Sequence, residues 1–234
     1  MENPVLRGDL RARSRSRKIW ILQAVYLSML GALAFLGLPP ELGRFSESNE
    51  TSLYVAVLWV QIVMVAYFAS ACVIQEIAVE GEKAAIDLVF APFSPATIVA
   101  GKSLGSLVTI GYWLALGAPL LVLTTAIRQI PTVSLLPAAS LIAVVAWGIA
   151  QIGLLYSVLL DAEFLRTVTH WGTLLAIFVG TILLPSPLRG LNPIVAVTDA
   201  ARGLLPATAM GAYGAVGVGC ALWTCRRLRG LAAG

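Results

Sequence analysis

Residues 101–127 read GKSLGSLVTIGYWLALGAPLLVLTTAI, a Gly-Lys-Ser triplet followed by a long apolar run. A helix needs roughly 20 apolar residues to cross a bilayer, and residues 104–127 contain no charged side chain. The triplet also occurs in phosphate-binding loops, but such a loop requires a glycine where this chain has Ala96 and a preceding β-strand. We therefore interpret the stretch as the start of a membrane span, not as a site for ATP.

The composition of the whole chain is that of a polytopic membrane protein. Of its 234 residues 59% are hydrophobic and 12% are charged, and the mean hydropathy is +0.87, whereas soluble proteins are about 45–50% apolar and about 25% charged. We expect an all-α fold, a single domain over residues 1–234 whose bundle of six transmembrane helices occupies residues 19–225. The six spans are predicted near 19–38, 53–75, 104–127, 133–160, 167–184 and 206–225.

The basic residues predict the orientation of this bundle. Twelve of the 16 Lys and Arg lie on one side of the predicted spans, and four lie on the other: Arg44, Arg128, Arg189 and Arg202. Because cytoplasmic loops are enriched in Lys and Arg, both termini should be cytoplasmic in a cell membrane, with residues 226–234 as a cytoplasmic tail. The net charge of +4 then reflects topology and gives no reason to expect nucleic acid.

The N-terminal segment carries its own pattern. Arg7, Arg11, Arg15 and Lys18 recur at helical spacing beside a small apolar face, which predicts an amphipathic helix over residues 1–18 lying along the cytoplasmic headgroups. The alternative is a disordered basic leader that only sets the topology.

The predicted spans contain no Asp, Glu, Lys or Arg. Ion-coupled carriers usually need ionisable groups within the membrane, so no proton relay is evident. His170 lies near the start of the fifth span and has no carboxylate neighbour within it, which favours a structural role over proton transfer. We expect no enzyme and no bound metal, because one histidine and three scattered cysteines do not form a zinc cluster or a catalytic triad.

Residues 76–102, between the second and third spans, read EIAVEGEKAAIDLVFAPFSPATIVAGK. Ile86, Leu88, Val89 and Phe90 would form one apolar side of a short helix that ends at the following prolines. Such a helix can dock on a soluble partner and carry its movement into the membrane. An ordinary connector resting on the headgroups is the alternative.

The order of residues in this segment resembles the loop between the second and third spans of ABC-2-type transporter permeases. The matching residues are Glu80, Glu82, Ile86-Asp87-Leu88, Ala91-Pro92-Phe93-Ser94-Pro95 and Gly101-Lys102. Asn3-Pro4-Val5-Leu6 and Leu191-Asn192-Pro193 match that family's leader and its last external loop. Gly81 and Ala84-Ala85 depart from the usual Arg and Gly-Thr.

The resemblance implies a half-transporter with no cofactor of its own. Permeases of this family pair with a second permease subunit, and separate ATPase subunits that bind ATP and Mg²⁺ dock on their cytoplasmic helices. The resemblance assigns this docking to a cytoplasmic coupling helix that includes Glu80, Glu82, Ile86, Asp87, Leu88 and Phe90. Residues 185–205 would correspond to partly re-entrant external helices; an ordinary surface loop is the alternative.

Polar and aromatic residues within the spans are the candidates for lining a translocation path. They are Gln23, Tyr26, Gln61, Tyr67, Tyr112, Gln151 and Tyr156. Since none is charged, we expect an amphipathic or lipid-like substrate, moved outward. These residues could instead only join helices by hydrogen bonds.

Two other functions fit the same layout. The chain could be the membrane subunit of a haem-export or cytochrome c maturation ABC complex, or a non-transporting membrane anchor or assembly factor.

Overall fold

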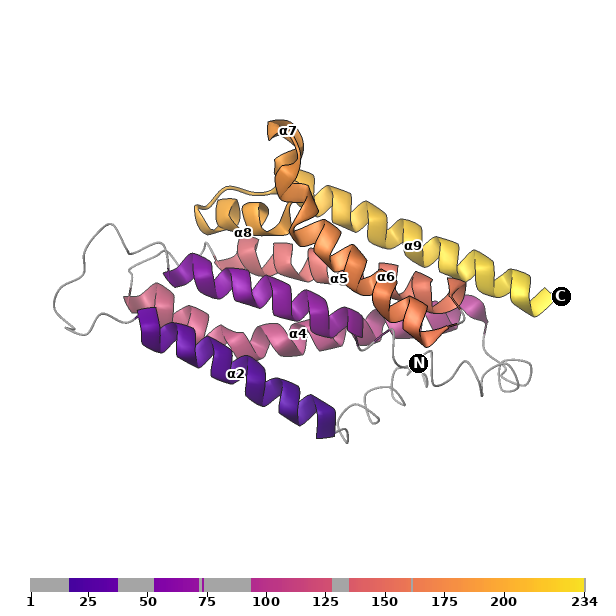
Figure 1. Ribbon diagram of the computed structural model, residues 1–234, viewed down its shortest axis with the longest axis horizontal. Helices are drawn as coiled ribbons and strands as arrows, with labels where there is room; N and C mark the ends of the chain where they lie inside the picture. The colour runs from indigo at the N-terminus through magenta and orange to yellow at the C-terminus, as the bar shows by residue number, and fades with distance from the viewer. Residues whose placement is uncertain are drawn as a thin grey trace.

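The computed structural model describes residues 17–37, 53–71, 73, 94–127, 135–160 and 162–233. All regular elements within these ranges are helices, and no strand occurs among them, which confirms the all-α prediction. The long helices run roughly along the long axis of the molecule (Figure 1). They are α2 (Arg17–Gly37), the helix Leu53–Ala71, α4 (Pro95–Ile127), α5 (Leu135–Leu159), α6 (Glu163–Phe178) and α9 (Ala207–Ala233).

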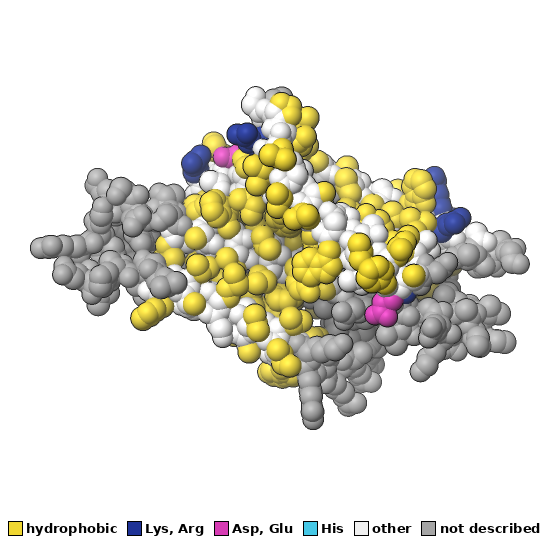
Figure 2. Space-filling view, viewed as in Figure 1, with side chains coloured by type: hydrophobic (Ala, Val, Ile, Leu, Met, Phe, Trp, Pro, Cys, Tyr) yellow, Lys and Arg dark blue, Asp and Glu magenta, His cyan; other side chains and the backbone are white. Residues whose placement is uncertain are grey.

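Three of these helices are long and apolar enough to cross a membrane: Leu53–Ala71, Pro95–Ala126 and Leu135–Leu159. A shorter apolar helix spans Ile19–Phe35. Among the residues that Figure 2 does not draw in grey, hydrophobic side chains cover most of the visible face, and few Lys, Arg, Asp or Glu side chains appear on it. Soluble monomers rarely expose apolar patches larger than a few hundred Å², so the molecule has the surface of a membrane-embedded protein.

Several helices extend beyond the predicted spans. Helix α4 begins at Pro95, nine residues before the predicted third span. The hydroxyl of Ser94 accepts a hydrogen bond from Thr97 N at 3.3 Å and thereby caps the helix. The Gly101–Ser103 triplet therefore lies inside a helix, where its backbone cannot wrap a phosphate. Helix α9 continues to Ala233, so most of the expected tail is helical.

Helix α5 lies at the centre of the bundle, where it packs most extensively against α9 and also contacts α4, α6 and α8. Glycines allow the close approach of α5 and α9. A Cβ added at Gly148 would lie 2.7 Å from the carbonyl oxygen of Tyr213, and one at Gly217 would lie 2.5 Å from the Trp147 ring. Small residues of this kind are typical of packed membrane helices, because lipid supplies no hydrophobic driving force between them.

The helix Leu53–Ala71 is also deeply buried and contacts elements on several sides. Phe68 stacks on Trp113 of α4 with ring centroids 4.3 Å apart. Tyr67 lies against Trp171 of α6 with centroids 5.1 Å apart. These contacts place the second predicted span inside the bundle.

Residues 180–201 form short helices and not one surface loop. They are η3 (Gly180–Leu183), α7 (Ser186–Arg189) and α8 (Pro193–Ala201). Ala196, Val197 and Ala200 of α8 are buried, and α8 packs on α5. Figure 1 shows α7 projecting from the upper side of the bundle, near the start of α9, and α8 lying along the bundle.

The predicted interfacial helix over residues 1–18 lies outside the described residues, apart from Arg17 and Lys18 at the start of α2. The predicted coupling residues Glu80, Glu82, Ile86, Asp87, Leu88 and Phe90 also lie outside them.

Candidate functional site

Four of the seven predicted path residues gather where α2, the helix Leu53–Ala71 and α4 meet. Tyr26 and Gln61 are fully buried, and both reach the backbone of α4 at Gly117. A Cβ at Gly117 would lie 2.5 Å from the Tyr26 hydroxyl and 2.8 Å from Gln61 Nε2. We call the set Gln23, Tyr26, Gln61, Tyr112 and Gly117 the Tyr26–Gln61 cluster.

Hydrogen bonds and ring contacts hold the α2 side of this cluster. Tyr26 Oη donates to the carbonyl oxygen of Trp113 at 3.4 Å, and Gln23 Nε2 donates to Tyr112 Oη at 2.6 Å. The ring of Tyr26 lies edge-on to that of Trp113, with centroids 5.2 Å apart. The rings therefore fix the Tyr26 hydroxyl in position over α4.

Gln61 differs from its neighbours, because neither Nε2 nor Oε1 has a hydrogen-bond partner within the described part of the chain. Leaving a buried polar group unpaired costs about 1–3 kcal/mol, and such groups in native structures call for an explanation. The amide offers two donor hydrogens and an acceptor oxygen without charge. It is therefore equipped to bind a neutral polar group, such as a hydroxyl, an ester or an amide.

The same region of α4 contains an interruption in its backbone hydrogen bonding. Pro119 lies inside the helix, and because proline has no N–H, the carbonyl oxygen of Ala115 lacks its usual helical donor. Gly117 lies between these two residues. The cluster thus contacts α4 beside a point where its helical hydrogen bonding is interrupted.

The three remaining path candidates make contacts elsewhere. Gln151 Nε2 donates to Ser103 Oγ at 2.9 Å, and Tyr156 Oη is 2.9 Å from Thr173 Oγ1. Tyr67 packs on Trp171, as described above. Each joins two helices, so these side chains fit the alternative interpretation of interhelical contacts.

A second buried polar group lies between the helix Leu53–Ala71 and α6. Ser70 Oγ is 3.0 Å from His170 Nε2, and His170 is 4% exposed. Arg166 lies one turn before His170 on the same buried side of α6. A structural role for His170 agrees with this arrangement.

Two basic side chains are more deeply buried in the protein than the sequence indicated. Lys102 and Arg166 were expected outside the spans, but α4 and α6 begin early enough to include them, and they are 3% and 7% exposed. The spans were predicted to begin at residues 104 and 167, where the apolar runs begin. Hydropathy does not detect the turns of helix that precede an apolar run.

Asn192 connects the short helices to the bundle. Its Oδ1 accepts from the backbone N–H groups of Ile194 at 2.8 Å and Val195 at 3.2 Å, which caps α8. Its Nδ2 donates to the carbonyl oxygen of Phe178 at 3.0 Å and to Thr181 Oγ1 at 2.7 Å. The Leu191-Asn192-Pro193 match drew attention to this residue, but nothing in the sequence indicated its two-sided bonding.

Two further bonds hold the same region. Trp59 Nε1 donates to Thr198 Oγ1 of α8 at 2.9 Å, and Tyr213 Oη donates to the carbonyl oxygen of Leu191 at 3.1 Å. The segment is therefore joined to α6, α9 and the helix Leu53–Ala71.

No group of three His, Cys, Asp or Glu side chains that could hold a metal ion occurs in the ranges that the structure describes. In comparisons with known proteins, no protein-family model matches this sequence, and no curated protein matches it.

Proposed function

We propose that this chain is the permease subunit of an ABC exporter of the ABC-2 type, acting with a separate ATPase subunit and a second permease subunit. In this proposal six segments cross the membrane, with both termini cytoplasmic: α2, the helix Leu53–Ala71, α4, α5, α6 with η3, and α9. Helix α6 has 16 residues and η3 has four. At 1.5 and 2.0 Å per residue they reach about 32 Å together, close to the hydrocarbon thickness of about 30 Å.

The observation that carries the proposal is the course of α4. This helix has 33 residues, which corresponds to about 50 Å. It begins directly after the segment predicted to contact an ATPase, and Gly117 lies 22 residues from its start, about 33 Å along the helix. One continuous helix therefore joins the predicted coupling segment to the Tyr26–Gln61 cluster.

This geometry supports a mechanical transmission. A partner that displaces the Pro95 end of α4 would move Gly117 against Tyr26 and Gln61, because the three groups are in contact. If Gly117 moved away from Gln61, the buried Gln61 amide would become accessible to a polar group of the substrate. The neutral cluster and its aromatic frame favour an amphipathic or lipid-like substrate, which the transporter would move outward.

A pull-down of the tagged chain in mild detergent, followed by mass spectrometry, tests the proposal. We expect a soluble ATPase with the wild type and none with the double variant Leu88→Asp, Phe90→Asp. Leu42→Asp provides a control, because the same kind of change falls in a predicted external loop and should leave the partner bound.

The outcome also separates the alternatives. Haem-handling proteins among the captured partners would favour the haem-export complex. An ATPase that binds the chain but drives no ATP-dependent transport in proteoliposomes would favour a membrane anchor. Absence of any ATPase under conditions that preserve other membrane complexes would overturn the transporter proposal.

A further inference from the structure

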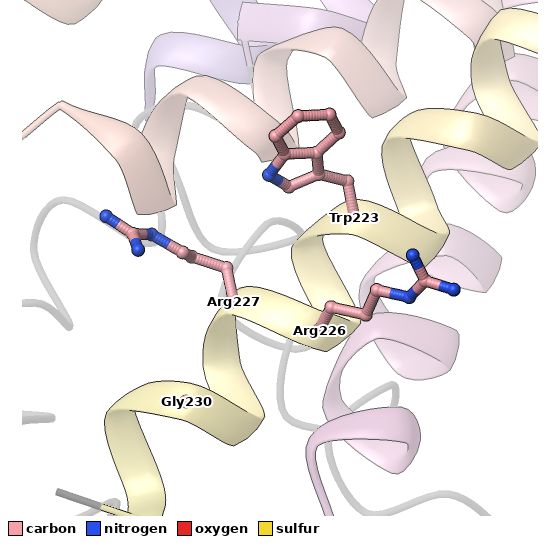
Figure 3. A pocket seen from close by; sticks show the side chains of 4 residues that line it. All are labelled: Trp223, Arg226, Arg227 and Gly230. Atoms are coloured by element: carbon pink, nitrogen blue, oxygen red, sulfur yellow. The ribbon is translucent and has the colours of Figure 1, made fainter.

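A hollow of about 350 Å³ lies on the last turns of α9, lined by Trp223, Arg226, Arg227 and Gly230. Figure 3 shows the Trp223 ring standing between the two arginine side chains, which extend to either side of it. The spacing i, i+3, i+4, i+7 places all four residues on one side of the helix. Gly230 leaves the end of the hollow open, since a Cβ there would meet no atom within 4 Å.

The hollow lies where the end of a membrane span would meet the headgroups. Helix α9 begins at Ala207, and Arg226 follows 19 residues later, about 28 Å along the helix axis. This distance is close to the hydrocarbon thickness of about 30 Å. Tryptophan and arginine are the side chains expected at that depth, because each combines an apolar body with a polar end.

Within the part of the chain that the structure describes, the two guanidinium groups have no carboxylate partner. No carboxylate of the described residues forms an ion pair with Arg226 or Arg227; the ion pair recorded on this half of the chain joins Arg202 and Asp199, before α9 begins. Trp223 is 62% exposed, so the hollow is accessible from outside the bundle. Its charge and accessibility favour an anionic ligand from the surroundings.

The same side of α9 continues as an apolar track towards the membrane centre. One and two turns before Trp223 are Gly219, where a Cβ would meet nothing within 4 Å, and Val216, which is 43% exposed. An acyl chain can lie along such a track while its headgroup stays at the arginines. A free phosphate would make no use of these apolar residues.

We propose that this hollow binds one acidic phospholipid, with the headgroup phosphate beside Trp223 within reach of the Arg226 and Arg227 side chains that flank it, and an acyl chain along Gly219 and Val216. The site requires that α9 crosses the bilayer and requires neither an ATPase nor a transported substrate. Its binding can therefore be measured whether or not the proposed transport function holds.

Native mass spectrometry of the full chain in non-ionic detergent tests this site, with phosphatidylglycerol and phosphatidylcholine of equal chain length as ligands. We expect phosphatidylglycerol to bind more tightly. Arg226→Gln and Arg227→Gln should each weaken it about fivefold, the effect of one cation near an acidic surface. Arg229→Gln is the control. It removes one positive charge from the same turn of α9, but Arg229 does not line the hollow, so the affinity for phosphatidylglycerol should stay unchanged.

Two further variants test the shape of the site with the charges kept. Gly230→Leu should fill the hollow, and Trp223→Leu should remove the aromatic wall, so each should weaken phosphatidylglycerol binding. An unchanged gel-filtration profile establishes that a variant is folded.

Three results would overturn the proposal. Equal weakening by Arg229→Gln and Arg226→Gln would reduce the effect to general electrostatic attraction. Equal binding of both lipids would remove the headgroup specificity. Glycerol phosphate or an acidic peptide that displaces phosphatidylglycerol at equal concentration would identify a phosphate or protein site instead.

Discussion

The hydroxyl of Tyr26 and the side-chain amide of Gln61 converge on Gly117 from two different helices. A methyl group at position 117 would lie 2.5 Å from the first and 2.8 Å from the second. Contacts under 3.0 Å require something to shift, and both side chains are fully buried, so they have little room to do so. The absence of a side chain at residue 117 is therefore what allows α2 and the helix Leu53–Ala71 to meet α4 here.

Gly117→Ala should destabilise the protein. Overpacking a well-packed interior typically costs about 1–3 kcal/mol, and here the added Cβ would push two polar side chains away from α4. We expect a lower thermal unfolding temperature in detergent and reduced transport. Gly111→Ala is the matched control on the same helix, because its Cβ would meet nothing within 4 Å. A similar loss from both variants would show that the contact at Gly117 is not the cause.

Replacing Gln61 by Leu should separate stability from activity. The substitution keeps the approximate volume and removes two buried polar atoms that lack partners, so the unfolding temperature should stay the same or rise. Transport should fall if the amide binds a polar group of the substrate. Thermal unfolding and proteoliposome transport measured on the same preparation test both parts. Full transport by Gln61→Leu would remove Gln61 from the path.

Gln151→Leu provides the contrasting case. Gln151 Nε2 donates to Ser103 Oγ at 2.9 Å, so this variant should lose about 1 kcal/mol of stability. The loss arises because α4 and α5 would lose one of their hydrogen bonds. An unfolding temperature that rises as much as that of Gln61→Leu would contradict the assigned bonding.

The packing of α5 on α9 predicts a larger effect at Gly148. A Cβ there would lie 2.7 Å from a backbone carbonyl oxygen, that of Tyr213, which cannot move without shifting α9. Gly148→Ala should therefore destabilise the bundle by about 3 kcal/mol, at the upper end of overpacking effects. Gly219→Ala on α9, where the Cβ would meet nothing within 4 Å, should be neutral in the same thermal unfolding measurement.

Hydropathy predicted long apolar helices, and three of those that the structure describes are long and apolar enough to cross a membrane; the count of six spans stays a prediction. Hydropathy could not predict that α4 begins at Pro95, since the start depends on the local Ser94 cap and not on apolarity. It also could not predict which polar residues meet. Helices such as α5 are apolar on nearly all sides, so their sequences do not indicate which side faces which neighbour. The sequence placed Gln151 and Gln61 in one group, and only the packing shows that Gln151 bonds to Ser103 whereas Gln61 lies against Gly117.

Asn192 should be critical for the placement of α8. Asn192→Ala removes both the cap of α8 and the bonds to Phe178 and Thr181, and we expect a loss of about 2–3 kcal/mol. Asn192→Ser keeps an oxygen that can cap α8 but loses the two donated bonds. We therefore expect Asn192→Ser to lose about half as much stability as Asn192→Ala. Thermal unfolding of the two variants ranks them. Equal losses would show that the cap contributes nothing.

Cysteine labelling tests whether α9 crosses the bilayer, on which both proposals depend, and in which direction it does so. In a background with Cys72, Cys220 and Cys225 replaced by Ala, we expect a membrane-impermeant maleimide to label Leu205→Cys on intact cells. Leu205 lies just before α9 and is 65% exposed. Arg229→Cys should react only after permeabilisation, because the Arg-rich end should face the cytoplasm.

The other labelling patterns have distinct meanings. Labelling of Arg229→Cys alone on intact cells would reverse the orientation and place the lipid site in the opposite leaflet. Reaction of both positions from one side would show that α9 does not cross the bilayer. That result would overturn both the six-span topology and the lipid site. The lipid site requires α9 to cross the membrane, so that the distance of about 28 Å from Ala207 to Arg226 places the arginines at the headgroups.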